Sequence, residues 1–159
     1  MRADGTVVCS WGEKDADYAC YHDTEWGVPV TDDVRLYEKM CLEGFQSGLS
    51  WLTILRKREN FRSAFAEFEI EAVAKFGDVE VERLLSDAGI VRHRGKIEAT
   101  ITNARAALQT IEIHGSLAKF FWSFEPKHHH SIRTPSDVAS ATAESEQMSK
   151  ALKKLGWRF

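Results

Sequence analysis

Cysteine is scarce in this sequence, and an apolar segment long enough to cross a membrane is missing. The 159 residues hold only three cysteines, Cys9, Cys20 and Cys41, all in the amino-terminal part. An odd number of cysteines with no apolar leader before them is typical of a reducing setting rather than of a disulfide-bonded secreted protein. A helix that spans a bilayer needs about 20 consecutive apolar residues, which no stretch provides. We therefore expect a cytoplasmic protein without membrane contact.

A surplus of positive charge is missing as well. Lysine and arginine total 21 against 24 aspartates and glutamates, which gives a formal net charge of −3. Nucleic acid could bind such a protein only through a local basic patch. Charged residues make up 28% and apolar residues 43%, close to the globular average, and a chain of this length can bury one core. Residues 1–159 are therefore predicted to form a single domain.

Alternation of polar and apolar residues with a period of two is also absent, so the sheet content is expected to be low in a mainly helical chain. Residues 1–30 are expected to be loop-rich, with one short helical turn near 15–21, because glycine and proline interrupt them. Thr31 and Ser50 are predicted N-caps of the next two helices, and Lys57 and Arg58 are placed on or beside the exposed side of the second. Further helices are expected over 69–76, 78–89, 96–115, 116–124 and from about 142 to 156, with a long loop over 126–140.

A basic connection joins the two helices expected within 78–115. The turn between two helices exposes backbone N–H groups that no helix satisfies, and basic side chains beside them suit the phosphates of DNA. A solvated basic loop fits the same pattern. Contact with phosphates alone would not select a base sequence. The candidate DNA-binding residues are Gly89, Arg92, His93, Arg94, Gly95 and Lys96.

Two residues of the amino-terminal segment could bind a metal. Cys9 and His22 offer a thiolate and an imidazole, which are half of the four ligands of a structural zinc site. The run from His128 to His130 could contribute further ligands, although a surface histidine run is also common as a solvated segment. Cys20 and Cys41 are interpreted as small buried apolar residues.

The stretch over residues 18–51 combines aromatic rings with one carboxylate, Glu43. Aromatic faces beside a carboxylate suit a flat, cationic ring, which they would hold through charge and cation-π contact. A surface glutamate beside a core tryptophan is the alternative for the same pattern.

Five segments, taken in order, resemble the 3-methyladenine DNA glycosylase I family. The likeness covers nearly the whole chain, and several long motifs in one order make it far more specific than any single motif. The segments are CSWG at 9–12, YHDTEWGVP at 21–29, CLEGFQSGLSW at 41–51, KREN at 57–60 and DAGIVRHRGKI at 87–97.

The resemblance implies an all-α, helical DNA-glycosylase fold with a helix-hairpin-helix element over 78–115. It also implies a monofunctional repair enzyme that flips 3-methyladenine out of alkylated double-stranded DNA and releases it as the free base. We expect a monomer. Glu43 would be the catalytic residue. The substrate-binding residues would be Tyr21 and Trp51, with Tyr18, Trp11 and Trp26 as further lining.

This sequence departs from the family pattern at two points. Family members continue past Phe159, and their further segment carries two zinc ligands, a His and a Cys, so only Cys9 and His22 match the zinc motif here. The hairpin also lacks the usual proline. Two other functions stay open: a DNA-binding or alkyl-base-binding fragment without turnover, and a catalytic metal centre of Cys9, His22 and a carboxylate that hydrolyses a small substrate.

Overall fold

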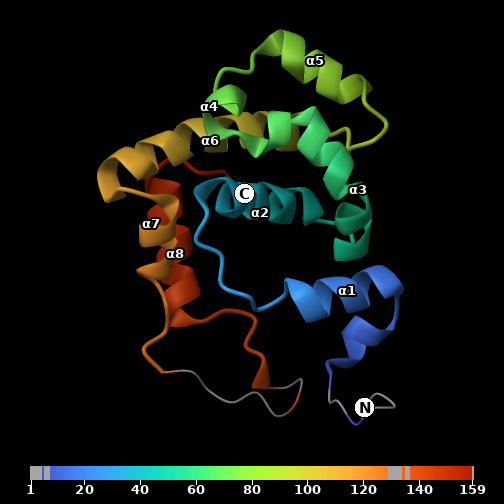
Figure 1. The fold of residues 1–159 in the computed structure, drawn as a ribbon. Coiled ribbons are helices and arrows are strands. Elements are labelled where there is room, and N and C mark those ends of the chain that lie inside the picture. Colours follow the sequence, from blue (N-terminus) through green and yellow to red (C-terminus); the bar gives the residue numbers. More distant parts are fainter. Residues whose placement is uncertain (1–4, 6–7, 129–133, 135–136, 159) are drawn as a thin grey trace.

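The computed structural model describes residues 5, 8–128, 134 and 137–158, and helices are the only regular elements among them (Figure 1). The all-α prediction is confirmed. In chain order the elements are η1 (Ser10–Glu13), α1 (Ala16–Thr24), α2 (Asp33–Gln46), α3 (Trp51–Ala64), η2 (Ala66–Phe68), α4 (Ile70–Val73), α5 (Asp78–Ser86), α6 (Arg94–His114), α7 (Leu117–Trp122) and α8 (Ala143–Lys154).

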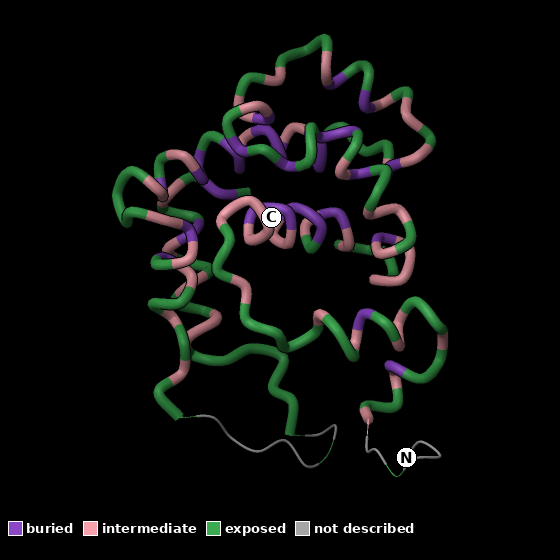
Figure 2. Tube along the Cα trace, viewed as in Figure 1, coloured by how far each residue is buried: buried purple, intermediate pink, exposed green. Residues whose placement is uncertain are grey.

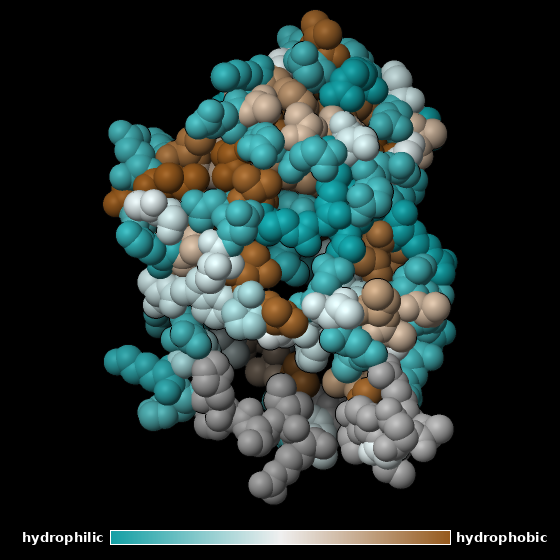
Figure 3. All heavy atoms as spheres, viewed as in Figure 1, coloured by the Kyte–Doolittle hydropathy of each residue, from teal (hydrophilic) through white to brown (hydrophobic). Residues whose placement is uncertain are grey.

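Helix α2 lies at the centre of the molecule and contacts α3, α6 and α7 (Figure 1). Its apolar stripe is buried at Tyr37, Cys41 and Phe45 and half-buried at Val34. The buried positions in Figure 2 gather on α2 and on the helices packed against it. Most of the molecular face in Figure 3 is hydrophilic, with apolar patches between the polar side chains. The helices on both sides of α2 therefore pack on one core.

Side-chain caps fix where most helices begin. Ser50 caps α3 as predicted, because its hydroxyl accepts a hydrogen bond from the Thr53 amide at 3.2 Å. The cap of α2 is Asp32, one residue beyond the predicted Thr31. Gly115 ends α6 with a φ of 86°, the left-handed conformation that favours glycine at a helix end.

The amino-terminal segment contains more helix than its sequence pattern predicted. Helix α1 extends to Thr24, although Tyr21 is its one buried residue among those described. Asp15 caps this helix, and Tyr21 packs on Trp51 of α3 with ring centroids 5.5 Å apart, while Arg56 of α3 forms exposed ion pairs with Asp15 at 2.7 Å and with Asp17 at 2.8 Å. A helix held mainly by a cap and one buried ring shows little apolar periodicity, so the pattern underestimated it.

Three helices in the middle of the chain also differ from prediction in their bounds. The helix expected over 69–76 is regular only within α4, after the turn η2, whose three residues all have positive φ. Helix α5 ends at Ser86 with Asp87 as its C-cap, so Gly89 does not cap it. Helix α6 begins at Arg94, which places Gly95 inside its first turn.

The carboxy-terminal part follows the prediction where it is described. Ser116 caps α7 and Thr142 caps α8. Of the predicted long loop over 126–140, His129 and His130 lie outside the described residues. Within the described part of the chain, none of the helices combines the length and apolar character needed to cross a bilayer.

Candidate functional site

A pocket of about 390 Å³ opens where η1, α1, the end of α2 and the start of α3 meet. Its volume lies within the range of about 300–1,000 Å³ usual for small-molecule sites. The structure brings together all six residues that were expected to hold a base, and adds Lys14 and Gln46, which the sequence did not single out. The lining residues are Trp11, Lys14, Tyr18, Tyr21, Trp26, Glu43, Gln46 and Trp51.

Trp11 is the centre of an aromatic cluster on one side of the pocket. Its ring meets the edge of Tyr18 at a centroid distance of 5.7 Å and that of Trp26 at 5.3 Å. His22 stacks on Trp26 at 5.7 Å with an interplanar angle of 14°. Edge-to-face and stacked pairs of this kind stabilise each other beyond simple burial. The cluster therefore joins η1 to α1 on this side of the pocket.

Tyr21 and Trp51 form another pair of rings in the pocket lining. Their ring centroids are 5.5 Å apart, and the planes are inclined at 51°. Tyr18 links α1 to α3, because its hydroxyl accepts a hydrogen bond from the Leu52 amide at 3.2 Å. The indole Nε1 of Trp51 is buried and has no hydrogen-bond partner among the described residues. A buried donor without a partner is rare in folded proteins.

Glu43 supplies the negative charge of the pocket. The residue is exposed to solvent, yet partial burial of the carboxyl group raises its pKa, and the nearby ammonium of Lys39 only partly offsets this effect. Burial also raises the pKa of Tyr21, and the carboxylates of Glu43 and Glu25 add to the rise. Tyr21 is therefore a neutral phenol at physiological pH, able to donate a hydrogen bond.

Comparison with known proteins decides the family of the chain. Residues 11–159 match the family described as methyladenine glycosylase. The chain belongs to this family. It is 49% identical over 154 residues to DNA-3-methyladenine glycosylase 1 of Escherichia coli, covering 95% of this chain and 82% of that protein.

Solved structures agree with this assignment of the methyladenine glycosylase. A crystal structure of a 3-methyladenine DNA glycosylase I matches with a TM-score of 0.88 and 46% identity, over 96% of this chain and 85% of the other. The Staphylococcus aureus 3-methyladenine DNA glycosylase I, solved to explain 3-methyladenine recognition, matches with a TM-score of 0.86 and 38% identity, over 94% and 81% of the two chains.

An ion-pair network joins α1, α2 and α3, the helices that form the pocket of this methyladenine glycosylase. The Arg58 guanidinium donates to Glu25 at 2.7 Å, and Glu25 follows α1 directly. Arg35 and Arg62 both pair with Glu38, whose side chain is 4% exposed. The prediction that Arg58 lies on or beside the exposed side of α3 is wrong, since the side chain is 20% exposed. Its partner is 33 residues away in sequence, so no local pattern could have revealed it.

The connection between α5 and α6 is attached to α3. Lys57 donates from Nζ to the carbonyl oxygens of Ala88 and Gly89, each at 3.0 Å. Asn60 donates to the Gly89 carbonyl at 3.3 Å. The Gly89 amide is not free for a phosphate in this structure, because it donates to the Asp87 carboxylate at 2.7 Å.

The basic residues after Gly89 have different roles from those predicted. Lys96 is 9% exposed, and its ammonium donates to the carbonyls of Phe45 and Ser47, so its expected contact with a phosphate is wrong. His93 caps α6 through Nδ1, which accepts from the Lys96 amide. Arg94 is half-exposed and pairs with Glu82 and Glu98. Arg92 is exposed and stays a candidate for DNA contact, together with Arg94.

The two expected zinc ligands do not complete a metal site. Cys9 is exposed at the start of η1, and His22 is half-buried, with Nδ1 2.9 Å from a carboxylate oxygen of Asp23. Among the described residues, no three His, Cys, Asp or Glu side chains are grouped so that they could hold an ion. A structural zinc needs four such ligands. The described residues alone therefore do not fit the group.

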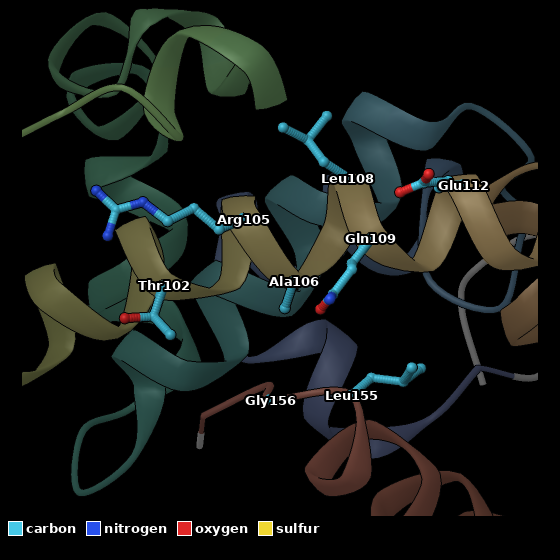
Figure 4. A pocket seen from close by; sticks show the side chains of 8 residues that line it. All are labelled: Thr102, Arg105, Ala106, Leu108, Gln109, Glu112, Leu155 and Gly156. Carbon is cyan, nitrogen blue, oxygen red and sulfur yellow. The ribbon is translucent and has the colours of Figure 1, made fainter.

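A second hollow of about 510 Å³ lies between α6 and the end of α8. Figure 4 shows Leu155 below α6, while Leu108 and Arg105 extend away from it. Arg105 is engaged with the carbonyl oxygens of Ala74 and Phe76. None of the residues expected in the site lies here, and no aromatic ring lines the hollow. The chemistry of base binding therefore belongs to the aromatic pocket.

Proposed function

We propose that this methyladenine glycosylase hydrolyses the N-glycosidic bond of 3-methyladenine in alkylated double-stranded DNA. The observation that carries the proposal is the convergence of Glu43 with the rings of Tyr21 and Trp51 in one pocket. Methylation at N3 gives the base a positive charge, and a carboxylate among aromatic faces is the environment that favours a flat cation. The names of the relatives support the same substrate.

Catalysis would begin with removal of the nucleotide from the base stack. The pocket can receive only an extruded base, and the cost of unpairing is smallest for a damaged nucleotide. Once the base is bound, the electron pair of the glycosidic bond moves onto it and neutralises its charge. The positive charge of the base already weakens this bond, so no strong acid is needed to protonate the leaving group.

Glu43 would act twice in this reaction. Its carboxylate accepts a hydrogen bond from the base, and its charge stabilises the oxocarbenium character that develops on the sugar. A water molecule adds to the anomeric carbon and loses a proton to the solvent, which completes the hydrolysis. Glu43 can play both roles only when it is ionised, which requires a pH above its raised pKa.

The connection over residues 87–93 would contact the DNA backbone as a helix-hairpin-helix element. This proposal rests on the exposed guanidinium groups of Arg92 and Arg94 and on the position of the connection between α5 and α6. Such contacts position the duplex without reading its sequence. The proposal includes a monomer, because one pocket and one connection suffice for the reaction.

Zinc at Cys9 and His22 and a cytoplasmic location also remain proposals. The zinc proposal rests on the family resemblance, and no step of the reaction depends on the metal. Elemental analysis of the purified protein tests it. The cytoplasmic location is supported by three free cysteines, Cys9, Cys20 and Cys41.

The direct experiment is incubation of the purified chain with N-methylated duplex DNA, followed by chromatography of the supernatant. Release of free 3-methyladenine supports the glycosylase function. Binding of alkylated or abasic duplex without release would instead select a protein that recognises the lesion but has no turnover.

A further inference from the structure

Two lysines link the α5–α6 connection to the helices that carry the pocket. One lysine reaches from α3 to the connection, and the other reaches from the start of α6 to the end of α2. Lys57 of α3 donates to the carbonyls of Ala88 and Gly89 in the connection. Lys96, in the first turn of α6, donates to the carbonyls of Phe45 at 2.8 Å and Ser47 at 2.5 Å. Each ammonium therefore joins two carbonyls that lie at least 31 residues away in sequence.

The carbonyls held by Lys96 lie on either side of the pocket residue Gln46, in the stretch that joins Glu43 to Trp51. Phe45 is in the last turn of α2, two residues after Glu43, and Ser47 is the C-cap of the same helix. The negative end of the helix dipole and two oriented carbonyls stabilise a buried ammonium. Removing the ammonium would release the turn over residues 47–50, which leads directly into Trp51.

The carbonyls held by Lys57 belong to the side of the molecule that faces DNA in the proposed function. Lys57 lies on α3, the helix that begins with Trp51. Asn60 on the same helix adds a third hydrogen bond, and a Cβ at Gly89 would lie only 3.2 Å from Asn60. The connection thus packs tightly against the helix that carries the pocket tryptophan.

We propose that Lys57 and Lys96 are positioning residues that hold the α5–α6 connection and the base pocket in one fixed arrangement. The inference rests on the proposed function, because it matters only if the connection contacts the DNA backbone while the pocket holds a base of the same strand. Neither lysine contacts the base. Misplacement of a bound group by about 1 Å can lower a rate by about 10²-fold, so two such links would control the rate of excision rather than the affinity for DNA.

The test compares Lys57→Met with Arg92→Met and with Lys150→Met, each of which removes one positive charge. Arg92 is an exposed candidate phosphate ligand, and Lys150 is exposed on α8, away from the site. Lys96→Met is the second test variant. If this substitution of a buried lysine prevents folding, the Lys57→Met variant decides the test, because Lys57 is only half-buried. Circular dichroism identifies a temperature at which every variant is folded.

Three quantities are measured on methylated duplex: the single-turnover rate at saturating enzyme, the dissociation constant, and its dependence on salt. Lys57→Met should lower the saturated rate about tenfold or more and leave the dissociation constant of the duplex and its salt dependence unchanged. Arg92→Met should reduce the slope of log K against log[salt] by about one and weaken binding of the duplex. Lys150→Met should match the wild type in all three.

Two results would overturn the inference while the proposed function stands. One is a wild-type saturated rate in Lys57→Met, which would leave the lysine with a purely structural role. The other is a salt slope reduced as in Arg92→Met, which would make Lys57 a phosphate ligand. Absence of base release by the wild type is a different outcome, since it overturns the proposed function and the inference with it.

Discussion

Tyr21 and Trp51 face each other with ring centroids 5.5 Å apart and planes inclined at 51°. A flat base stacked between two rings needs about 7 Å between them, because each stacked pair of atoms is separated by about 3.5 Å. The two rings are therefore too close to hold a base between them in this arrangement. A base in the pocket would stack on one ring, and the Tyr21 hydroxyl would be left to make a polar contact.

Tyr21→Phe separates the hydroxyl from the ring. We expect the affinity for free 3-methyladenine to fall about fivefold, the equivalent of about one hydrogen bond of 1 kcal/mol, because the phenol donor is lost while the stacking surface remains. Quenching of tryptophan fluorescence during titration with the free base measures this affinity. An unchanged affinity would show that the hydroxyl does not contact the base.

Glu43→Gln tests the charge of the pocket at nearly constant shape. The saturated excision rate should fall about 10²-fold or more, because the neutral amide cannot stabilise the positive charge that develops on the sugar. Single-turnover release from methylated duplex measures the rate, and circular dichroism verifies the helical fold. Gln46→Glu, on the same pocket wall, shows whether a carboxylate at a neighbouring position restores the rate in the double variant. Full activity in Glu43→Gln would remove the residue from the mechanism.

The raised pKa of Glu43 makes opposite predictions for activity and for stability. Activity requires the ionised form, so the rate should fall as the pH drops through a value above that of an ordinary glutamate. Stability follows the other direction: the contribution of Glu43 is fully present below its unfolded pKa and is lost as the pH rises through the folded pKa. Urea unfolding of wild type and Glu43→Gln from pH 4 to pH 7 should show the glutamine variant gaining relative stability as the pH rises.

The residues that line the pocket were easier to predict from the sequence than the residues that hold the pocket in place. Tyr18, Tyr21, Glu43 and Trp51 lie within one short stretch whose composition already indicates a site for a flat ring. The role of Lys96 was not predictable, because its burial depends on the packing of α6 against the end of α2, 51 residues away in the case of Phe45. A lysine in a basic run has the same local pattern whether it faces solvent or a helix end.

Arg58→Met tests the ion pair behind the pocket. Burial of Glu25 raises its pKa, but the hydrogen bond and charge of Arg58 outweigh burial, and the net pKa is lowered. Loss of the half-buried pair should reduce the free energy of unfolding by about 1–2 kcal/mol at pH 7. The loss should shrink as the pH falls through the lowered pKa of Glu25, where the pair disappears in the wild type as well. Urea unfolding at pH 7 and pH 3 measures both values.

Arg56→Met is the matched control for that substitution. Arg56 is one of two neighbouring arginines on α3 that pair with α1, but its side chain is 54% exposed. An exposed ion pair contributes little to stability, so the unfolding midpoint should stay close to that of the wild type. An equal loss of stability in both variants would mean that the buried pair with Glu25 stabilises the contact between α1 and α3 no more than any arginine of α3 does.

Gly12→Ala tests whether the aromatic cluster shapes the pocket. A Cβ at Gly12 would lie 2.9 Å from Cγ of His22, closer than real Cβ atoms approach, so the imidazole must move. Because His22 stacks on Trp26 and meets Trp11 edge-on, its displacement should disturb the pocket wall. We expect a loss of about 1–3 kcal/mol in unfolding free energy, a shift in tryptophan emission and weaker binding of free 3-methyladenine. Gly77→Ala is the control, since the nearest atom to its Cβ would be 3.8 Å away. Normal base binding in a destabilised Gly12→Ala would show that the cluster maintains the fold without shaping the pocket.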